Sequence, residues 1–138
     1  MAFTGNYTCD TFKLGLPSGD FDFATGTTDV FKIALYTNNA TLDATTAAYT
    51  TVGEVVASGY TAGGIVLTPS LAISSGTSFI DFNDVSWSGA FTARGALIYK
   101  NGGAAICVLD FGADRTSTTT FQVQFPAATS TSAIIRLS

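Results

Sequence analysis

Carboxylates are the side chains in this sequence whose types and spacing come closest to a reactive site. The aspartates occur in three loose pairs: Asp20 with Asp22, Asp81 with Asp84, and Asp110 with Asp114. A glycosidase needs two carboxylates facing one sugar, and calcium sites also gather acids. Each pair, however, lies in or near a turn rich in Gly or Ser, where Asp commonly caps the backbone. None has the spacing of a calcium-binding loop, so we predict turn-capping roles and no catalytic or metal-binding residue.

Other reactive constellations are excluded by composition. The sequence contains no histidine, which rules out a Ser-His-Asp triad, an HExxH zinc site and an imidazole base. Its two cysteines, Cys9 and Cys107, are too few for an all-cysteine zinc site, and we expect both to be free thiols. The segment Gly59–Gly64 lacks the Lys-Ser/Thr of a phosphate-binding loop and predicts a turn. We therefore predict a non-enzymatic protein without a cofactor.

Aromatic side chains offer one binding chemistry, the stacking of a sugar ring. The candidates are Trp87, Phe91 and the tyrosines Tyr36, Tyr60 and Tyr99. Most of them lie in strand-like segments among other apolar residues, which favours burial in the core. A carbohydrate-binding module is kept as an alternative, and it requires Trp87 and at least one tyrosine to be exposed.

Charge indicates which partners to expect. The net charge is -4, and the six basic residues are scattered along the chain. A nucleic-acid binder needs clustered cations, and so does a protein that binds an anionic membrane, so neither role is expected. No apolar run approaches the length that spans a bilayer, and the first residues do not resemble a signal peptide. We expect synthesis in the cytoplasm.

Short β-strands are the elements that must position these side chains. The chain has 138 residues, of which 46% are hydrophobic and only 12% charged, and Thr, Val, Ile and Phe are abundant. Predicted strands lie at residues 29–37, 55–60, 65–68, 71–73, 79–82, 85–88, 91–100, 104–111, 120–125 and 132–137. Asn101-Gly102 between two strand-like runs is a strong hairpin signal. We predict an all-β fold, an antiparallel sandwich or closed barrel of about 8–9 short strands.

The domain organisation follows from the same pattern. Residues 29–138 show one composition throughout and are predicted to form a single β-sandwich domain. Residues 1–28 are predicted to form an N-terminal arm or a short helix. Phe3, Tyr7 and Phe12 look exposed and could dock on a partner subunit by strand addition. The equally weighted alternative is that this arm folds back on its own core.

A resemblance narrows the function. The segments Asp29–Tyr36, Glu54–Gly64, Val85–Trp87, Arg94–Lys100 and Leu109–Gly112 occur in an order that resembles a family of small virion structural proteins of tailed bacteriophages. The resemblance covers roughly residues 29–137, and the blocks Gly59–Gly64 and Ile98–Lys100 are its most specific parts. It implies a component of the virion, made in the host cytoplasm, and supplies no catalytic residues.

Two places on such a particle are open. The leading hypothesis is a capsid decoration or cement protein that clamps adjacent subunits of the major capsid protein, with a homo-oligomer such as a trimer expected. The alternative is a tail, neck or fibre component that forms rings or contacts the host. The sequence does not separate the two, and their copy numbers per particle would differ.

Overall fold

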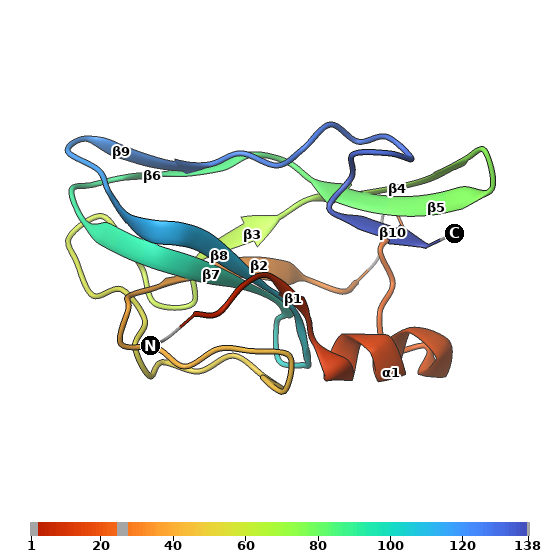
Figure 1. Cartoon of the computed structure of the whole chain (residues 1–138), viewed down its shortest axis with the longest axis horizontal. Helices are drawn as coiled ribbons and strands as arrows, with labels where there is room; N and C mark the ends of the chain where they lie inside the picture. Colours follow the sequence, from red (N-terminus) through yellow and green to blue (C-terminus); the bar gives the residue numbers. More distant parts are fainter. Residues whose placement is uncertain (1–2, 25–27, 138) are drawn as a thin grey trace.

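The computed structural model describes residues 3–24 and 28–137, and within them the chain is built from antiparallel strands with one helix (Figure 1). In chain order the elements are β1 (Tyr7–Thr8), α1 (Asp10–Ser18), β2 (Phe31–Tyr36), β3 (Ile65–Leu67), β4 (Pro69–Ser74), β5 (Thr77–Phe82), β6 (Val85–Ser88), β7 (Thr92–Lys100), β8 (Ala105–Thr116), β9 (Thr120–Val123) and β10 (Ile135–Leu137). The all-β prediction is confirmed. No helix in these residues is both long and apolar enough to cross a membrane.

The strands form a sandwich-like pair of layers. One layer is a five-stranded sheet in the order β1-β8-β7-β2-β3. The other contains a three-stranded sheet, β10-β5-β4, and a two-stranded sheet, β6-β9, which lie end to end above the first layer in Figure 1. Only Asn83 and Asp84 separate β5 from β6 in the chain. This short connection keeps the two smaller sheets in one layer.

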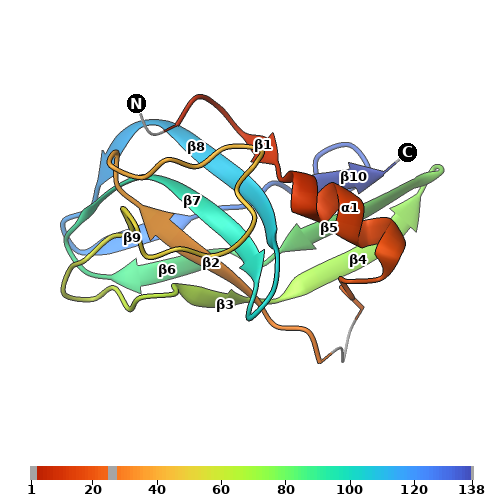
Figure 2. The ribbon, with the colours of Figure 1, turned by 90° about the horizontal axis from the view of Figure 1, so that it is seen from below.

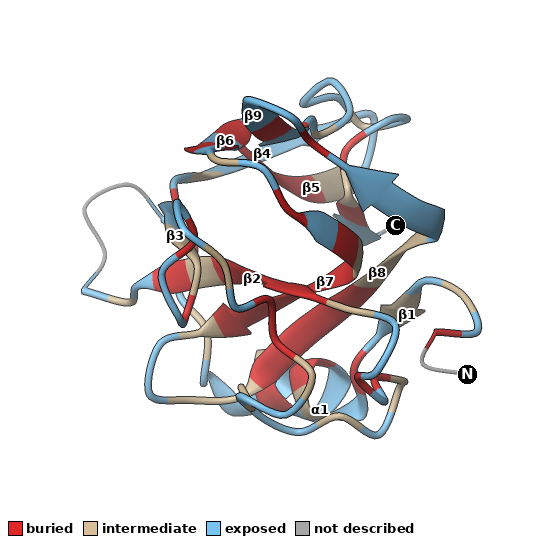
Figure 3. Cartoon of the chain, turned by 90° about the vertical axis from the view of Figure 1, so that its left-hand side faces the viewer, coloured by how far each residue is buried: buried red, intermediate tan, exposed pale blue. Residues whose placement is uncertain are grey.

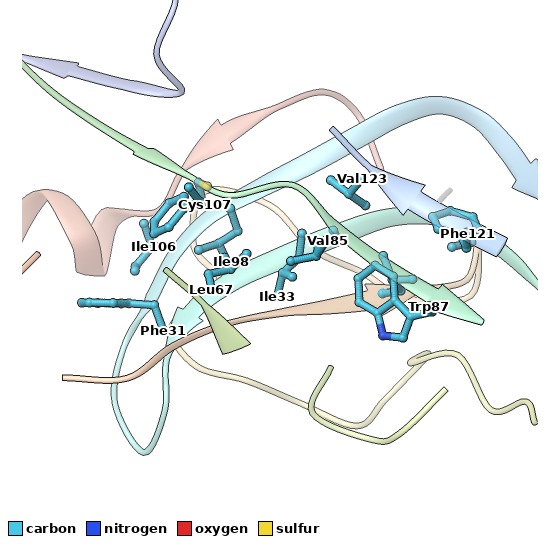
Figure 4. Packing of buried hydrophobic residues seen from close by; sticks show 14 of the residues in the cluster. Phe31, Ile33, Leu67, Val85, Trp87, Ile98, Ile106, Cys107, Phe121 and Val123 are labelled. Atoms are coloured by element: carbon cyan, nitrogen blue, oxygen red, sulfur yellow. The ribbon is translucent and has the colours of Figure 1, made fainter. Parts of the chain in front are cut away.

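Alternation in the sequence explains the second layer. Along β6 and β9, buried and exposed residues alternate strictly, as expected for a sheet with one wet face. Val85 pairs with Val123 and Trp87 pairs with Phe121, and all four side chains are buried. Figure 4 shows these side chains together with Ile33 of β2 in the space between the layers. The period-2 pattern therefore places the aromatic residues inside.

The central strands of the five-stranded sheet, β2 and β7, are buried on both faces. β2 and β7 carry continuous apolar runs, and Figure 3 shows both strands mostly buried, whereas β4 is exposed. One face meets the second layer. The other face holds a second apolar cluster that includes Phe3, Tyr36, Leu42 and Leu97. The N-terminal segment and the loop after β2 supply the covering side chains of that cluster.

One predicted strand is absent. Residues 55–60 form turns and irregular backbone, joined to the sheet by an isolated bridge between Glu54 and Tyr36. The apolar character of this segment serves burial instead, because Val55 and Tyr60 both enter the core between the layers. A short apolar run bounded by Gly predicts burial more safely than it predicts strand pairing.

Residues before β2 contain a helix that lies against the core. β1 pairs with β8, Tyr7 opposite Val108 and Thr8 opposite Cys107, and α1 follows directly. The helix ends at Gly19, whose φ of 83° is left-handed, and whose N–H bonds back to the carbonyls of the last turn. Figure 1 shows α1 below the layers, and in Figure 2, which views the molecule from below, α1 lies in front of the sheets.

Candidate functional site

The arm residues proposed for docking lie mostly inside the chain. Phe3 is fully buried and Phe12 is 1% exposed, so the expectation that they are exposed is wrong for both. Tyr7 is half-buried, and its hydroxyl bonds to the hydroxyl of Thr4. The reason is a long-range contact: pairing of β1 with β8 places Phe3 against Gly95 of β7, where no side chain competes for the space. The arm takes the second of its two predicted forms, folded back on the core.

The aspartate pairs do not form a reactive site. Asp22, Asp84 and Asp110 each accept hydrogen bonds from main-chain N–H groups of nearby or facing segments, as predicted for caps. Asp110 also forms an ion pair with Arg94 at 3.1 Å. Within residues 3–24 and 28–137, no three side chains of the His, Cys, Asp or Glu types gather to hold a metal ion.

Asp81 departs from that pattern. It lies within β5, not in a turn, and is 2% exposed. Its Oδ1 accepts the N–H of Phe82 at 2.9 Å. Burial raises the pKa of this carboxyl, and the nearby Asp84 charge adds to the effect. Asp81 is a buried structural carboxyl without a cation or a hydroxyl nucleophile beside it among the contacts described.

The aromatic platform is core, as predicted. Trp87 is 4% exposed and packs against Tyr60 and Phe121, with ring centroids 6.0 Å and 6.3 Å away. Tyr36, Tyr60 and Tyr99 are also buried. A sugar-stacking face made from these residues would have to be exposed, so the geometry removes the basis for a carbohydrate-binding module at Trp87.

The most organised polar cluster surrounds Glu54, the sole glutamate of the chain. Its carboxylate is 6% exposed and accepts three hydrogen bonds, from Tyr49 Oη at 2.6 Å, from Tyr60 Oη at 2.6 Å and from the N–H of Gly63 at 2.7 Å. Tyr99 Oη donates to the carbonyl of Gly63 at 2.7 Å. Residues 49–63 thus gather around one carboxylate, and Tyr99 of β7 joins them to the five-stranded sheet.

The tyrosines of this cluster remain protonated donors at neutral pH. Burial, reinforced by hydrogen bonding to Glu54 or by its charge, raises the pKa of Tyr49 and of Tyr60 far above the ordinary value. Burial and the Glu54 charge also raise the pKa of Tyr99 to about 12. A buried carboxylate that accepts hydrogen bonds from hydroxyl and amide donors forms a network that stabilises the surrounding structure. It fastens the loop of residues 48–64 to the sheet and leaves no free acid or base.

Both cysteines are free and buried. Burial and the nearby Asp10 and Asp43 charges raise the pKa of Cys9 to about 11, and burial raises the pKa of Cys107 further still. A nucleophilic cysteine needs a lowered pKa and access to substrate. Neither cysteine has these properties.

A feature that sequence reasoning missed is the free edge of β4. Among the described residues this strand pairs with β5 on one side only, and it is the outer strand of its sheet. Leu71 is 49% exposed and Ile73 is 73% exposed, and residues 55–80 carry no charged side chain. Natural sheets usually protect such an edge with Lys, a bulge or a covering loop. The sequence does not show that β4 lies at the edge of its sheet, because the order of strands is set by the tertiary structure.

No family model, curated protein or solved structure matches the chain.

Proposed function

We propose that this chain is a non-enzymatic structural subunit of a tailed-phage particle, a decoration or cement protein that binds adjacent capsid subunits on the head. The motif order of residues 29–137 supports a virion role through its resemblance to small virion proteins. The free edge of β4 is the observation that carries the binding role. Its exposed main-chain groups and apolar side chains suit strand addition to a neighbouring subunit.

The geometry of the edge fits that task. Leu71 and Ile73 are two residues apart, so their side chains lie on the same face of β4. β4 begins directly after β3, which pairs with β2 in the other layer. A neighbouring subunit bound to β4 would therefore be connected, through β4 and β3, to both layers of the sandwich. The absence of charge over residues 55–80 removes like-charge repulsion between packed copies.

Copy number per particle tests the place of this protein. Quantitative mass spectrometry of purified particles should give about one chain per major capsid subunit, or one per local threefold position. A few chains per hundred capsid subunits would overturn the head assignment and favour the tail, neck or fibre. Absence from the particle would overturn the virion role altogether.

A variant tests the surface. Leu71→Lys combined with Ile73→Lys should weaken binding to particles that lack the protein by on the order of tenfold or more, measured by co-sedimentation. The matched control is Val52→Lys with Val56→Lys, because those valines are 70% and 96% exposed and lie outside β4. Circular dichroism would confirm that both variants fold. Equal binding by the two variants would exclude the β4 edge as the contact.

A further inference from the structure

One lateral side of the sandwich presents several unpaired strand edges. In the first layer β8 has β1 beside it only at Cys107 and Val108, so its later residues have no strand on that side within the described chain. In the second layer β9 and β10 are also outer strands. On the other side, by contrast, residues 65–74 run directly from β3 in one layer to β4 in the other (Figure 1).

Three hollows lie on this side, and residues 107–109 and 111 of β8 line the third and the first of them. The first has a volume of about 710 Å³ and lies between β8 and β9, lined by Phe111, Arg115, Gln122 and others. The second and third, of about 680 Å³ and 190 Å³, lie between the N-terminal segment and β10. These two share Thr8 and residues 134–135, so they adjoin. We call the three together the lateral groove.

The charge of the lateral groove is opposite to that of the chain. Lys13, Arg115 and Arg136 line it, and no Asp or Glu is among its lining residues, although acids outnumber bases ten to six in the sequence. Elsewhere, Arg94 and Lys100 form ion pairs at 3.1 Å and 3.2 Å with carboxylates. The lateral groove therefore concentrates positive charge on an acidic protein.

The guanidinium groups of the two arginines in the lateral groove can still bind a carboxylate of a partner. Arg115 donates to the carbonyl of Phe111, and Arg136 donates to the carbonyl of Thr131. Lys13 has a carboxylate at 4.0 Å, that of Asp10, and both side chains are more than 60% exposed. Guanidinium groups bind carboxylates in bidentate fashion, and such bonds are stronger than those to neutral carbonyls.

The rest of the groove is suited to a polypeptide. β8 contains a bulge, because Asp110 pairs with Gly95 and Arg115 with Ala93, so five residue steps in β8 face two in β7. A bulged edge accepts a new strand poorly. β9 pairs regularly with β6, and its outer edge is free to accept one. Leu16 and Leu137 add apolar surface at the other end of the groove.

We propose that the lateral groove binds an extended segment of a partner protein in which carboxylates are interspersed with apolar side chains. Main-chain groups of the segment pair with the outer edge of β9, its apolar side chains cover Phe111 and Leu137, and its carboxylates bind Arg115 and Arg136. This surface shares no residue with the β4 edge. The inference therefore goes beyond the proposed decoration role, and either can fail while the other stands.

The test uses the full chain and a labelled eight-residue peptide that alternates valine and glutamate. Fluorescence anisotropy should show saturable binding. Replacing every glutamate by glutamine, or methylating the main-chain nitrogens of the peptide, should each weaken it by on the order of tenfold, because the first removes the charge and the second removes main-chain donors. Arg115→Gln with Arg136→Gln should weaken binding of the original peptide by a similar factor.

The control variant has the same net charge as the double variant Arg115→Gln with Arg136→Gln. Val52→Glu with Val56→Glu also lowers the charge by two, on exposed residues outside the groove, and should bind the peptide as the wild type does. Absent peptide binding, or equal loss in both variants, would overturn the proposal. Tighter binding of single-stranded oligothymidylate than of the peptide would identify a phosphate site instead. Self-association lost only in the arginine variant would identify a second copy as the occupant.

Discussion

The hydroxyl of Tyr60 donates a hydrogen bond to Glu54 Oε2 at 2.6 Å and accepts one from the N–H of Leu35 at 2.9 Å. One atom thus connects the only glutamate of the chain to β2 in the middle of the five-stranded sheet. The connection explains why the segment before Tyr60 is held in place without forming a strand.

Tyr60→Phe should lower the free energy of unfolding by about 1–3 kcal/mol, because it leaves the Leu35 N–H and a lone pair of Glu54 unsatisfied in a buried place. Urea denaturation followed by Trp87 fluorescence measures the change. Tyr7→Phe is the control, since the hydroxyl of Tyr7 bonds to Thr4 in an exposed place. Equal losses in the two variants would contradict the role given to the Glu54 cluster.

Gly64→Ala should prevent folding or cost several times more than Gly76→Ala. Both glycines have a left-handed φ, 81° and 78°, so alanine strains the backbone similarly at either position. At Gly64, however, an added Cβ would lie 1.7 Å from the carbonyl oxygen of Ile33, whereas at Gly76 nothing lies within 4 Å. Thermal unfolding of the two variants separates steric overlap from backbone strain. Similar Tm values would show that the loop can move away from β2.

Trp87→Ala should cost about 3–5 kcal/mol, as expected for a large aromatic side chain removed from a packed core. Trp87→Phe should cost clearly less, since it retains an aromatic ring and removes an indole N–H that has no hydrogen-bond partner among the described residues. Val56→Ala, at a 96% exposed position, should change stability by less than about 0.5 kcal/mol. Chemical denaturation gives all three values. A Trp87→Ala variant as stable as the wild type would place the indole at the surface.

Asp81→Asn should flatten the pH dependence of stability in the acid range. Because the pKa of Asp81 is raised in the folded chain above its ordinary value of 3.8, the folded state holds this proton more tightly than the unfolded state. The favourable contribution is complete below pH 3.8 and is lost as the pH rises through the folded pKa. As the pH rises from acid to neutral, the stability of Asp81→Asn relative to that of the wild type should therefore increase. Urea midpoints at several pH values measure this, with exposed Asp114→Asn as the control, and parallel pH profiles for Asp81→Asn and wild type would contradict it.

The thiols should be unreactive while the chain is folded. Cys9, with a pKa raised to about 11, and Cys107, raised further, carry almost no thiolate at pH 8, and both are buried. A chromogenic disulfide reagent should therefore react with neither cysteine in buffer and with both in guanidinium chloride. Rapid reaction of one thiol in buffer would show that the N-terminal segment opens.

Local patterns predicted most of the strands but not what their edges would meet. The apolar surroundings of Trp87 in a strand-like segment were sufficient to predict its burial, and the structure shows buried and exposed residues alternating along β6 with a period of two. The docking arm was harder to predict. Phe3 looks exposed in a segment of small and polar residues, yet it is buried by contact with Gly95, which lies far along the chain.

The sequence by itself determined the fold class, the absence of histidine chemistry and the inward position of Trp87 and of the tyrosines Tyr36, Tyr60 and Tyr99. These depend on residue type and short-range period, which a linear chain displays directly. Only the tertiary structure decided that Glu54 meets Tyr49, Tyr60 and Gly63, that β4 is an outer strand, and that Arg115 and Arg136 line one groove. The last two relationships depend on which strands become neighbours, and the Glu54 contacts depend on how residues 48–64 fold against the sheet. Both are set by the packing of the whole chain.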